Sequence, residues 1–244
     1  EQERPPQAMG YSDAGDVVEV GGDVKDARVG QPMSMMAPHA EYVVGTMEGE
    51  RAAGFPMVDG MSYDASTFLP LAGGAVAWTL IAPVEPGDTV VVTGQGLVGN
   101  LCAQAVRQRR PGRVITVDAL DLRCRISREC GADEVINYNE EDIRERVREI
   151  TNRAGVDCVV DHVGADFFAA AFASLRNGGR YGICGATTGL RTELHLGQLF
   201  SQRKEIYGVF MGTKEDMREI VEMLNRGAVK PVVDRTFPLA EAAA

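Results

Sequence analysis

The sequence contains no run of 18 or more apolar residues, which argues against a membrane-spanning helix. Its first residues also lack the basic stretch followed by an apolar run that defines a signal peptide. Nor is there an excess of positive charge, because the sequence has 25 Lys and Arg against 35 Asp and Glu. Nucleic acid and anionic membranes repel such an acidic surface. We therefore expect a cytoplasmic protein whose partner is a small-molecule substrate, and neither nucleic acid nor a membrane.

Cysteine is scarce, and no two cysteines form a C-x-x-C pair. Their odd number and long spacings argue against a disulfide framework, and a reduced setting accounts for them more simply. Most lie in apolar runs, where a thiol behaves as a small hydrophobe. The five are Cys102, Cys124, Cys130, Cys158 and Cys184.

The chain from Asp88 onward alternates short runs rich in Val and Ile with longer stretches of helical period. Strands covered on both faces have such apolar runs, and their alternation with helices predicts a parallel sheet with right-handed crossovers. Six strands in this rhythm predict the doubly wound order 3-2-1-4-5-6. A turn is expected at Asn177-Gly178-Gly179. We expect strands at 88–93, 113–117, 134–136, 156–161, 180–184 and 205–209, and helices at 97–109, 121–130, 140–153, 165–175 and 214–226.

The first 66 residues have a different character, rich in Gly, Val, Met and Pro. Short strand-like pieces at 16–20 and 40–44 indicate all-β material with many turns. The segment 231–238 is strand-like again, and we expect it to return to this β region. A length of 244 residues suits one large domain, or one domain with part of another. The expected divisions are 1–66, 67–230 and a return segment 231–244.

The most informative motif is the glycine-rich segment Gly94-Gln95-Gly96-Leu97-Val98-Gly99. By itself the pattern is weak, because an ordinary strand-to-helix turn accounts for it equally well. Here it follows a predicted strand directly and opens a predicted helix, as in a dinucleotide-binding fold. In that fold the first glycine permits a tight turn, the second lets a pyrophosphate approach, and the third lets the helix pack against the sheet. The start of the helix then offers free N–H groups and a positive dipole end to the phosphates.

The predicted second strand ends in Asp118, 19 residues beyond Gly99, where this fold places an acid against the adenosine ribose. A carboxylate there accepts both ribose hydroxyls and repels a 2′-phosphate, so it favours NAD over NADP. Asp118 also suits a helix cap, which is the alternative interpretation. Arg123 keeps NADP open, because a nearby cation either holds a phosphate or hydrogen-bonds to the ribose of NAD.

The other half of the cofactor is expected at the carboxyl ends of the fourth and fifth strands. There Val163-Gly164 and Gly185-Ala186 would let the backbone come close to the second ribose and the nicotinamide. His162 is a tempting catalytic base at the first of these ends, although a histidine packed at a strand end is more often structural.

Several segments together resemble the medium-chain dehydrogenase/reductase superfamily: GQGLVG, VITVD, CGADEVINY, GVDCVVDHVG and LRNGGRYGICGATTG. The stretch from Leu196 to Ala244 is most similar to its zinc-type alcohol dehydrogenase branch, and the superfamily also contains quinone oxidoreductases. A weaker resemblance to the GroES-like catalytic domain of the family covers Met9-Gly10, Asp13–Gly21 and Pro38–Val44. Against the family the chain resembles a member truncated at both ends.

The resemblance implies a two-domain subunit, with a partial GroES-like catalytic domain over 1–66 and an NAD(P)-binding Rossmann domain over 67–230. Cofactor and substrate would meet between the two. It implies hydride transfer between nicotinamide C4 and an alcohol, a carbonyl or an activated double bond. It also implies a homodimer or homotetramer, and it places Phe210-Met211 over the nicotinamide.

The zinc-dependent members of the family have Gly-His-Glu where this chain has Gly10-Tyr11-Ser12. Tyr and Ser do not hold zinc in a tetrahedral site of nitrogen and sulfur ligands, and no cysteine precedes Cys102. We therefore expect no zinc. Tyr11 then becomes the candidate proton donor, with Ser12 and His39 as weaker candidates.

The sequence thus predicts an NAD(P)-dependent oxidoreductase of the alcohol dehydrogenase type. Two alternatives stay open: a zinc-independent quinone or enone reductase, and a cofactor-binding protein without turnover. Zinc independence suits the reductase, but such members commonly use NADPH, which Asp118 disfavours.

Overall fold

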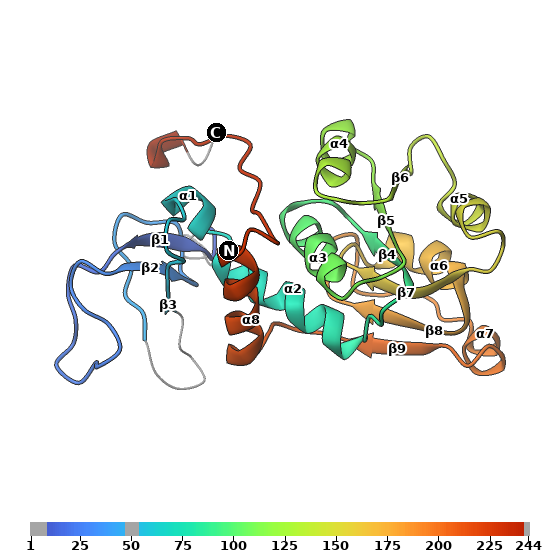
Figure 1. The fold of residues 1–244 in the computed structure, drawn as a ribbon, viewed down its shortest axis with the longest axis horizontal. Helices are drawn as coiled ribbons and strands as arrows, with labels where there is room; N and C mark the ends of the chain where they lie inside the picture. Colours follow the sequence, from blue (N-terminus) through green and yellow to red (C-terminus); the bar gives the residue numbers. More distant parts are fainter. Residues whose placement is uncertain (1–8, 47–53, 242–244) are drawn as a thin grey trace, which may run out of the picture. The chain divides into compact units, whose positions relative to one another are not determined.

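The computed structural model describes residues 9–46 and 54–241 (Figure 1). The chain divides into two compact units, one of residues 1–71 with 231–244 and one of residues 72–230. No helix among the described residues is long and apolar enough to cross a membrane. All five cysteines have free thiols in the structure.

The larger unit is built on a six-stranded sheet in which every neighbouring pair of strands is parallel. Its order, β6-β5-β4-β7-β8-β9, is the doubly wound order predicted from the sequence, so this unit is a Rossmann fold. Val90, Val91 and Val92 show why the runs are apolar throughout, because both faces of their strand are buried. The strands are β4 (Thr89–Thr93), β5 (Arg113–Asp118), β6 (Glu134–Asn137), β7 (Val156–Asp161), β8 (Leu175–Ile183) and β9 (Glu205–Gly208).

Five predicted helices connect these strands or follow them, and three further helices of the described structure were missed, of which α1 (Tyr63–Ser66) lies in the smaller unit. α2 (Leu69–Ile81) is apolar on all sides and nearly all buried, so it has no amphipathic stripe to reveal it. α7 (Leu196–Ser201) is short, and its start is capped by the His195 side chain. The predicted helices are α3 (Leu97–Gln108), α4 (Asp121–Glu129), α5 (Ile143–Ile150), α6 (Ala165–Ser174) and α8 (Lys214–Asn225).

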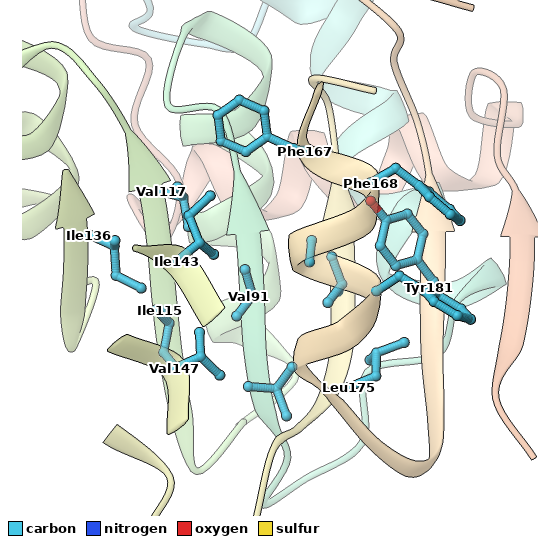
Figure 2. Packing of buried hydrophobic residues seen from close by; sticks show 14 residues of the cluster. Val91, Ile115, Val117, Ile136, Ile143, Val147, Phe167, Phe168, Leu175 and Tyr181 are labelled. Atoms are coloured by element: carbon cyan, nitrogen blue, oxygen red, sulfur yellow. The ribbon is translucent and has the colours of Figure 1, made fainter. Parts of the chain in front are cut away.

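Apolar side chains between the sheet and two helices, α5 and α6, form the core in Figure 2. Val91 and Ile115 face this layer from the sheet, and Phe168 packs edge-on against Tyr181 with 5.1 Å between ring centroids. Because all six strands run parallel, their carboxyl ends meet at one edge of the sheet.

The smaller unit contains an antiparallel sheet of three short strands, β1 (Asp13–Asp16), β2 (Pro32–Met35) and β3 (Gly54–Pro56). It also contains α1 (Tyr63–Ser66) and a 3-10 turn at Leu239–Glu241. The three-stranded sheet agrees with the prediction of a partial GroES-like all-β domain.

Three predicted strands of the smaller unit are wrong. β1 ends at Asp16, because the bonds between residue 17 and residues 30 and 31 close the hairpin there, so 17–20 lie in a loop. Residues 40–44 form no strand: they have no strand pairing among the described residues, and Tyr42 and Val44 are largely exposed. Residues 231–238 are also without strand pairing in the described structure.

The turn predicted at Asn177-Gly178-Gly179 lies inside β8 instead. β8 begins at Leu175, which pairs with Val156, and the register then shifts through an irregularity before Arg180. Gly178 takes φ +72°, so the glycine-rich piece distorts the strand locally without ending it.

Candidate cofactor site

The glycine loop connects β4 to α3, and its three glycines differ in what their missing side chains allow. Gly94 has φ +75°, a conformation that other residues rarely adopt. A Cβ at Gly99 would lie 1.7 Å from the carbonyl oxygen of Gly94, so the helix packs on the loop only without a side chain. A Cβ at Gly96 would meet nothing nearer than the Arg123 guanidinium at 3.8 Å. The protein leaves space beside Gly96 that a ligand can use.

The N-terminus of α3 is open to a ligand as well. Gly96 is its N-cap residue, and no side chain caps the helix. Leu97 and Val98 open the first turn, and Leu97 is exposed. Free N–H groups at the start of a 12-residue helix form a ready anion site.

Asp118 lies at the end of β5, and its carboxylate already holds the loop together. Oδ2 accepts the Gln95 amide at 2.7 Å, and Oδ1 accepts the amides of Ala119 and Leu120 at 2.8 and 3.0 Å. A carboxylate has about four acceptor positions, so about one remains open, on Oδ2. Asp118 therefore serves the loop itself and keeps one acceptor position in addition.

Arg123 extends from α4 toward the same place. Its Nη1 is 3.6 Å from Asp118 Oδ2, and its side chain is half exposed. The guanidinium and the carboxylate thus lie beside the open space at Gly96, where an adenosine ribose would carry either a hydroxyl or a 2′-phosphate.

The loops that follow β7 and β8 pack directly on one another. A Cβ at Gly164 would lie 2.7 Å from Ala186 Cα, and one at Gly185 would lie 2.6 Å from the His162 carbonyl oxygen. The Val163 side chain reaches the glycine loop, 3.0 Å from where a Cβ on Gly94 would be. Both loop glycines are therefore required by the protein's own packing, whatever the ligand.

Asp161 is buried at the end of β7 and accepts hydrogen bonds from the hydroxyls of Thr93 and Tyr181, at 2.5 and 2.7 Å. It also accepts the backbone amides of the next loop. Burial and the neighbouring carboxylate raise the pKa of Tyr181, which keeps the phenol protonated. The sequence carried a signal for this group, since Thr93 and Asp161 are the polar ends of two apolar strands, but their convergence was not predicted.

His162 packs edge-on against Trp78, with 4.6 Å between ring centroids. Its Nε2 is buried and has no hydrogen-bond partner among the described residues. Burial lowers the pKa of His162 to about 3, so the imidazole is neutral. This geometry supports the structural interpretation of His162 over a catalytic base.

Phe210 and Met211 follow β9 at the same carboxyl edge of the sheet. The Phe210 side chain is 91% exposed, and Met211 takes a left-handed conformation with φ +51°. A Cβ at Gly212 would lie 2.5 Å from the Gly73 carbonyl oxygen in α2, so the segment is anchored by a close backbone contact. Strained residues of this kind concentrate at functional sites.

The three catalytic candidates lie in the smaller unit. The His39 ring is against Gly10, where a Cβ would come within 2.2 Å of it, so the histidine lies against the residue that precedes Tyr11. The Ser12 hydroxyl donates to the Thr67 carbonyl oxygen. The Tyr11 side chain is 59% exposed.

These residues do not fit a zinc site. Neither Tyr11 nor Ser12 is a ligand of the usual kind. Within the described parts of the chain, no group of three or more His, Cys, Asp or Glu side chains comes together to hold a metal ion.

Comparisons with known proteins agree with this architecture. The family model for zinc-binding dehydrogenases matches residues 98–226. Sorbitol dehydrogenase of Bacillus subtilis (strain 168) is 28% identical over 157 residues, which cover 64% of this chain and 44% of that enzyme. The 2-haloacrylate reductase of Burkholderia sp is 28% identical over 260 residues, covering 98% of this chain and 76% of that protein.

Among solved structures, an NAD-dependent alcohol dehydrogenase superposes with a TM-score of 0.83 at 26% identity. The superposition covers 98% of this chain and 78% of that one. Against the first curated relatives the chain spans only about half of their length, as the 44% of sorbitol dehydrogenase shows.

Proposed function

The chain belongs to the zinc-binding dehydrogenase family of the medium-chain dehydrogenase/reductase superfamily, and from this we propose that it is an NAD(P)-dependent oxidoreductase. The observation that carries the proposal is the glycine loop, where open space at Gly96 adjoins an uncapped helix start and the Asp118 carboxylate. A nicotinamide cofactor bound there supplies hydride transfer between its C4 and a substrate carbon.

The residues of the larger unit divide the work of holding the cofactor. The backbone from Gly96 to Gly99 binds the pyrophosphate through the helix start. Asp118 accepts one ribose hydroxyl, and Arg123 donates to the other. The backbone of the loops at 163–164 and 185–186 faces the nicotinamide half, and Phe210 with Met211 covers it.

The proposed reaction interconverts an alcohol and a carbonyl. In the reducing direction the carbonyl carbon gains the hydride, and its oxygen gains a proton. We assign the proton to the Tyr11 phenol, because it is exposed and stands where the zinc-dependent members have a histidine. Ser12 is a poorer donor, since its hydroxyl proton already bonds to Thr67, and His39 beside Gly10 is the remaining candidate.

The proposed cofactor is NAD rather than NADP. A carboxylate at the ribose would repel a 2′-phosphate, and the position of Asp118 at the end of β5 supports this role. Arg123 offsets part of this repulsion, so we expect a preference and not an absolute choice.

The second candidate function is a zinc-independent reductase of activated double bonds. The similarity to 2-haloacrylate reductase favours it, because it extends over 98% of this chain. Hydride would then add to the β-carbon of the conjugated system, and the same Tyr11 proton would go to the α-carbon. A cofactor-binding protein without turnover is the third candidate.

The remaining proposals concern setting and assembly. The five free thiols suit a reducing, cytoplasmic location. β9 is an edge strand of the sheet, and we propose that it pairs with a second copy in a homodimer or homotetramer. For the domains we propose a GroES-like part over 1–66, joined by 231–244, and a Rossmann part over 67–230.

A stopped-flow assay with NADH and NADPH tests the function. The panel holds aldehydes, ketones, quinones and enones, and cofactor absorbance is followed. Turnover on carbonyls supports the first candidate, and turnover on enones or quinones alone supports the second. Cofactor binding without any turnover supports the third, and absence of binding refutes all three. A metal measurement near one zinc per chain would contradict the zinc-independent mechanism.

A further inference from the structure

Asp161 is a fully buried carboxylate whose partners in the described structure are all uncharged. Its Oδ1 accepts the Thr93 hydroxyl at 2.5 Å and the Val163 amide at 2.9 Å. Its Oδ2 accepts the Tyr181 hydroxyl at 2.7 Å, and the Gly164 amide lies 3.2 Å from both oxygens. The side chain therefore joins the carboxyl ends of β4, β7 and β8 to the loop that follows β7.

Burying a charge without a cation is expensive, and charge-assisted hydrogen bonds only partly offset the cost. An apolar residue would avoid the buried charge, but it would leave the donors that Asp161 accepts without this partner. What the carboxylate adds is control of the backbone at Val163 and Gly164, whose amides point inward at it. Gly164 has φ +93° and opens α6 without a side-chain cap of its own, and the Thr188 hydroxyl, from the loop after β8, accepts the Asp166 amide at 3.1 Å.

The same residue reaches the second loop through its backbone. Its carbonyl oxygen accepts the amides of Cys184 and Gly185 at 2.8 and 3.2 Å. The neighbouring Val163 carbonyl accepts the Thr188 amide at 3.0 Å, which locks the loop after β8 onto the loop after β7. Both loops thus take their positions from one short stretch centred on Asp161.

We propose that Asp161 is a positioning residue for the nicotinamide half of the cofactor site. It touches no cofactor itself; it sets the backbone of 162–164 against 185–186, while Asp118 sets the adenosine half separately. The inference rests on the proposed function. A purely structural Asp161 would instead stabilise the whole unit and favour neither half of the site.

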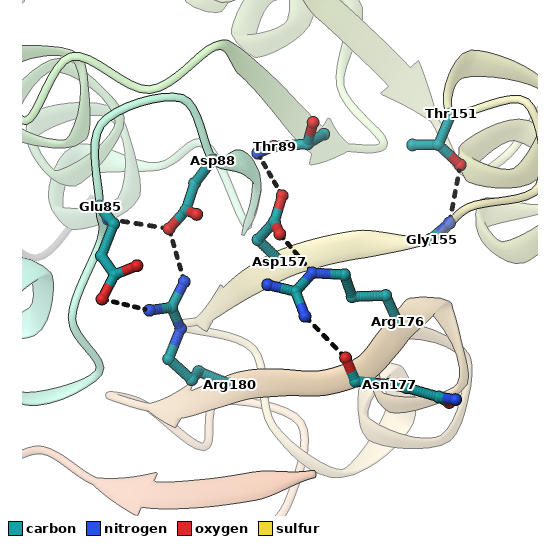
Figure 3. Close-up of polar contacts among 9 residues, drawn as sticks. All are labelled: Glu85, Asp88, Thr89, Thr151, Gly155, Asp157, Arg176, Asn177 and Arg180. Carbon is teal, nitrogen blue, oxygen red and sulfur yellow. Dashed lines mark hydrogen bonds and ion pairs between the residues drawn. The ribbon is translucent and has the colours of Figure 1, made fainter. Parts of the chain in front are cut away.

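The test compares NADH with ADP, which has the adenosine and both phosphates but no nicotinamide. Dissociation constants are measured by calorimetry for the wild type, Asp161→Asn and Asp157→Asn. Asp157 is the matched control, because it lies on the same strand and bonds the Thr89 amide and Arg176 at the opposite edge of the sheet (Figure 3). NADH fluorescence reports the surroundings of the nicotinamide ring.

Asp161→Asn is expected to weaken NADH binding about 10-fold, the size of a weakened set of charge-assisted hydrogen bonds, and to leave ADP within about 2-fold. Its NADH fluorescence shifts toward the value in water. Asp157→Asn leaves both ligands within about 2-fold, whatever it does to thermal stability. Tyr181→Phe removes one donor to the carboxylate and keeps the ring. It is expected to weaken NADH binding about 3-fold and to leave ADP binding unchanged, which keeps the test open even if the Asn variant does not fold.

The inference is overturned if the ratio of NADH to ADP affinity is unchanged in Asp161→Asn and Tyr181→Phe. This holds whether neither affinity changes or both affinities fall equally. In either case the wild type still binds NADH, so the proposed function survives. A wild type that binds neither NADH nor NADPH refutes the proposed function and the inference with it.

Discussion

Gly99 lies so close to Gly94 that a Cβ on the first would sit 1.7 Å from the carbonyl oxygen of the second. The contact fixes α3 against the end of β4 with no room for a side chain. Gly96, between them, has φ −67°, and a Cβ there would only touch the Arg123 guanidinium at 3.8 Å, an ordinary contact distance. Gly99 is therefore needed for the fold, and Gly96 is free to contact a ligand.

Alanine substitutions separate these two roles. Gly99→Ala forces the loop apart and is expected to lower the free energy of unfolding by about 3 kcal/mol, the upper range for overpacking. Gly96→Ala meets no steric conflict in the protein, so its unfolding free energy stays within about 1 kcal/mol of the wild type. Its methyl group occupies the space proposed for the pyrophosphate, and NADH affinity falls at least about 10-fold. Urea denaturation and calorimetry measure the two effects.

The control is an alanine at a glycine elsewhere in the chain. Gly15 is suitable, because it has open space around it and an ordinary φ, whereas Gly87 has φ +91° and an alanine there would be strained. Gly15→Ala should leave both NADH affinity and unfolding essentially unchanged. Normal NADH binding by a folded Gly96→Ala protein would remove the main support for a cofactor at this loop.

Arg123 provides the cleaner test of cofactor preference. Changing Asp118 would also release the amides of Gln95, Ala119 and Leu120, and so disturb the loop. Arg123→Ala removes only a half-exposed cation beside the ribose position. NADPH affinity is expected to fall about 10-fold, because the 2′-phosphate loses its charged partner, while NADH stays within about 3-fold.

Arg125→Ala is the matched control, since Arg125 lies on the same helix and pairs with Glu129 on the exposed side. It should change neither dissociation constant. Equal changes in NADH and NADPH affinity on Arg123→Ala would show that Arg123 does not face the 2′ position.

Burial of His162 predicts a pH-dependent stability. Its pKa is about 3 in the folded protein and about 6.5 when unfolded. Between these two pH values the unfolded chain binds a proton at His162 that the folded protein does not bind. The free energy of unfolding is therefore highest above pH 6.5 and falls as the pH drops toward 3. Between pH 7 and pH 5 the loss is about 2 kcal/mol.

Urea denaturation of the cofactor-free protein at pH 7 and pH 5 measures this loss. His162→Phe keeps an aromatic ring against Trp78 and sacrifices no hydrogen bond at Nε2. The variant should be less sensitive to pH by the same amount, since the other titrating groups are unchanged. Identical pH dependence in both proteins would place a proton or a partner on His162 in the folded state.

The parts predicted well from the sequence are those that local pattern determines. Val90 to Val92 are buried on both faces and read as one apolar run, and this gave the parallel sheet and its order. The expectation of a strand at 40–44 failed because a segment makes a strand only where a partner pairs with it, and no described residue pairs with this one.

The site followed the same division. Spacing predicted where the glycine loop and Asp118 lie, at the start of α3 and the end of β5, because a short segment carries both the turn and the helix start. The mutual packing of Gly164 with Ala186 was not found, since these residues belong to different strands and meet only in the folded sheet. The convergence of Thr93 and Tyr181 on Asp161 was missed for the same reason.

Tyr11→Phe tests the assigned proton donor. The substitution keeps the ring and removes only the hydroxyl, so folding and NADH affinity should match the wild type. Turnover on the best substrate of the panel should fall by about 100-fold or more, the usual contribution of a general acid. Ser12→Ala should cost only a few-fold, because its hydroxyl is engaged with the Thr67 carbonyl oxygen. The solvent isotope effect on turnover distinguishes Tyr11 from Ser12 as the donor further. If Tyr11 delivers the proton, the effect is present both in the wild type and in Ser12→Ala. Full turnover by Tyr11→Phe would exclude the phenol and leave His39, whose ring adjoins Gly10, as the next candidate to substitute.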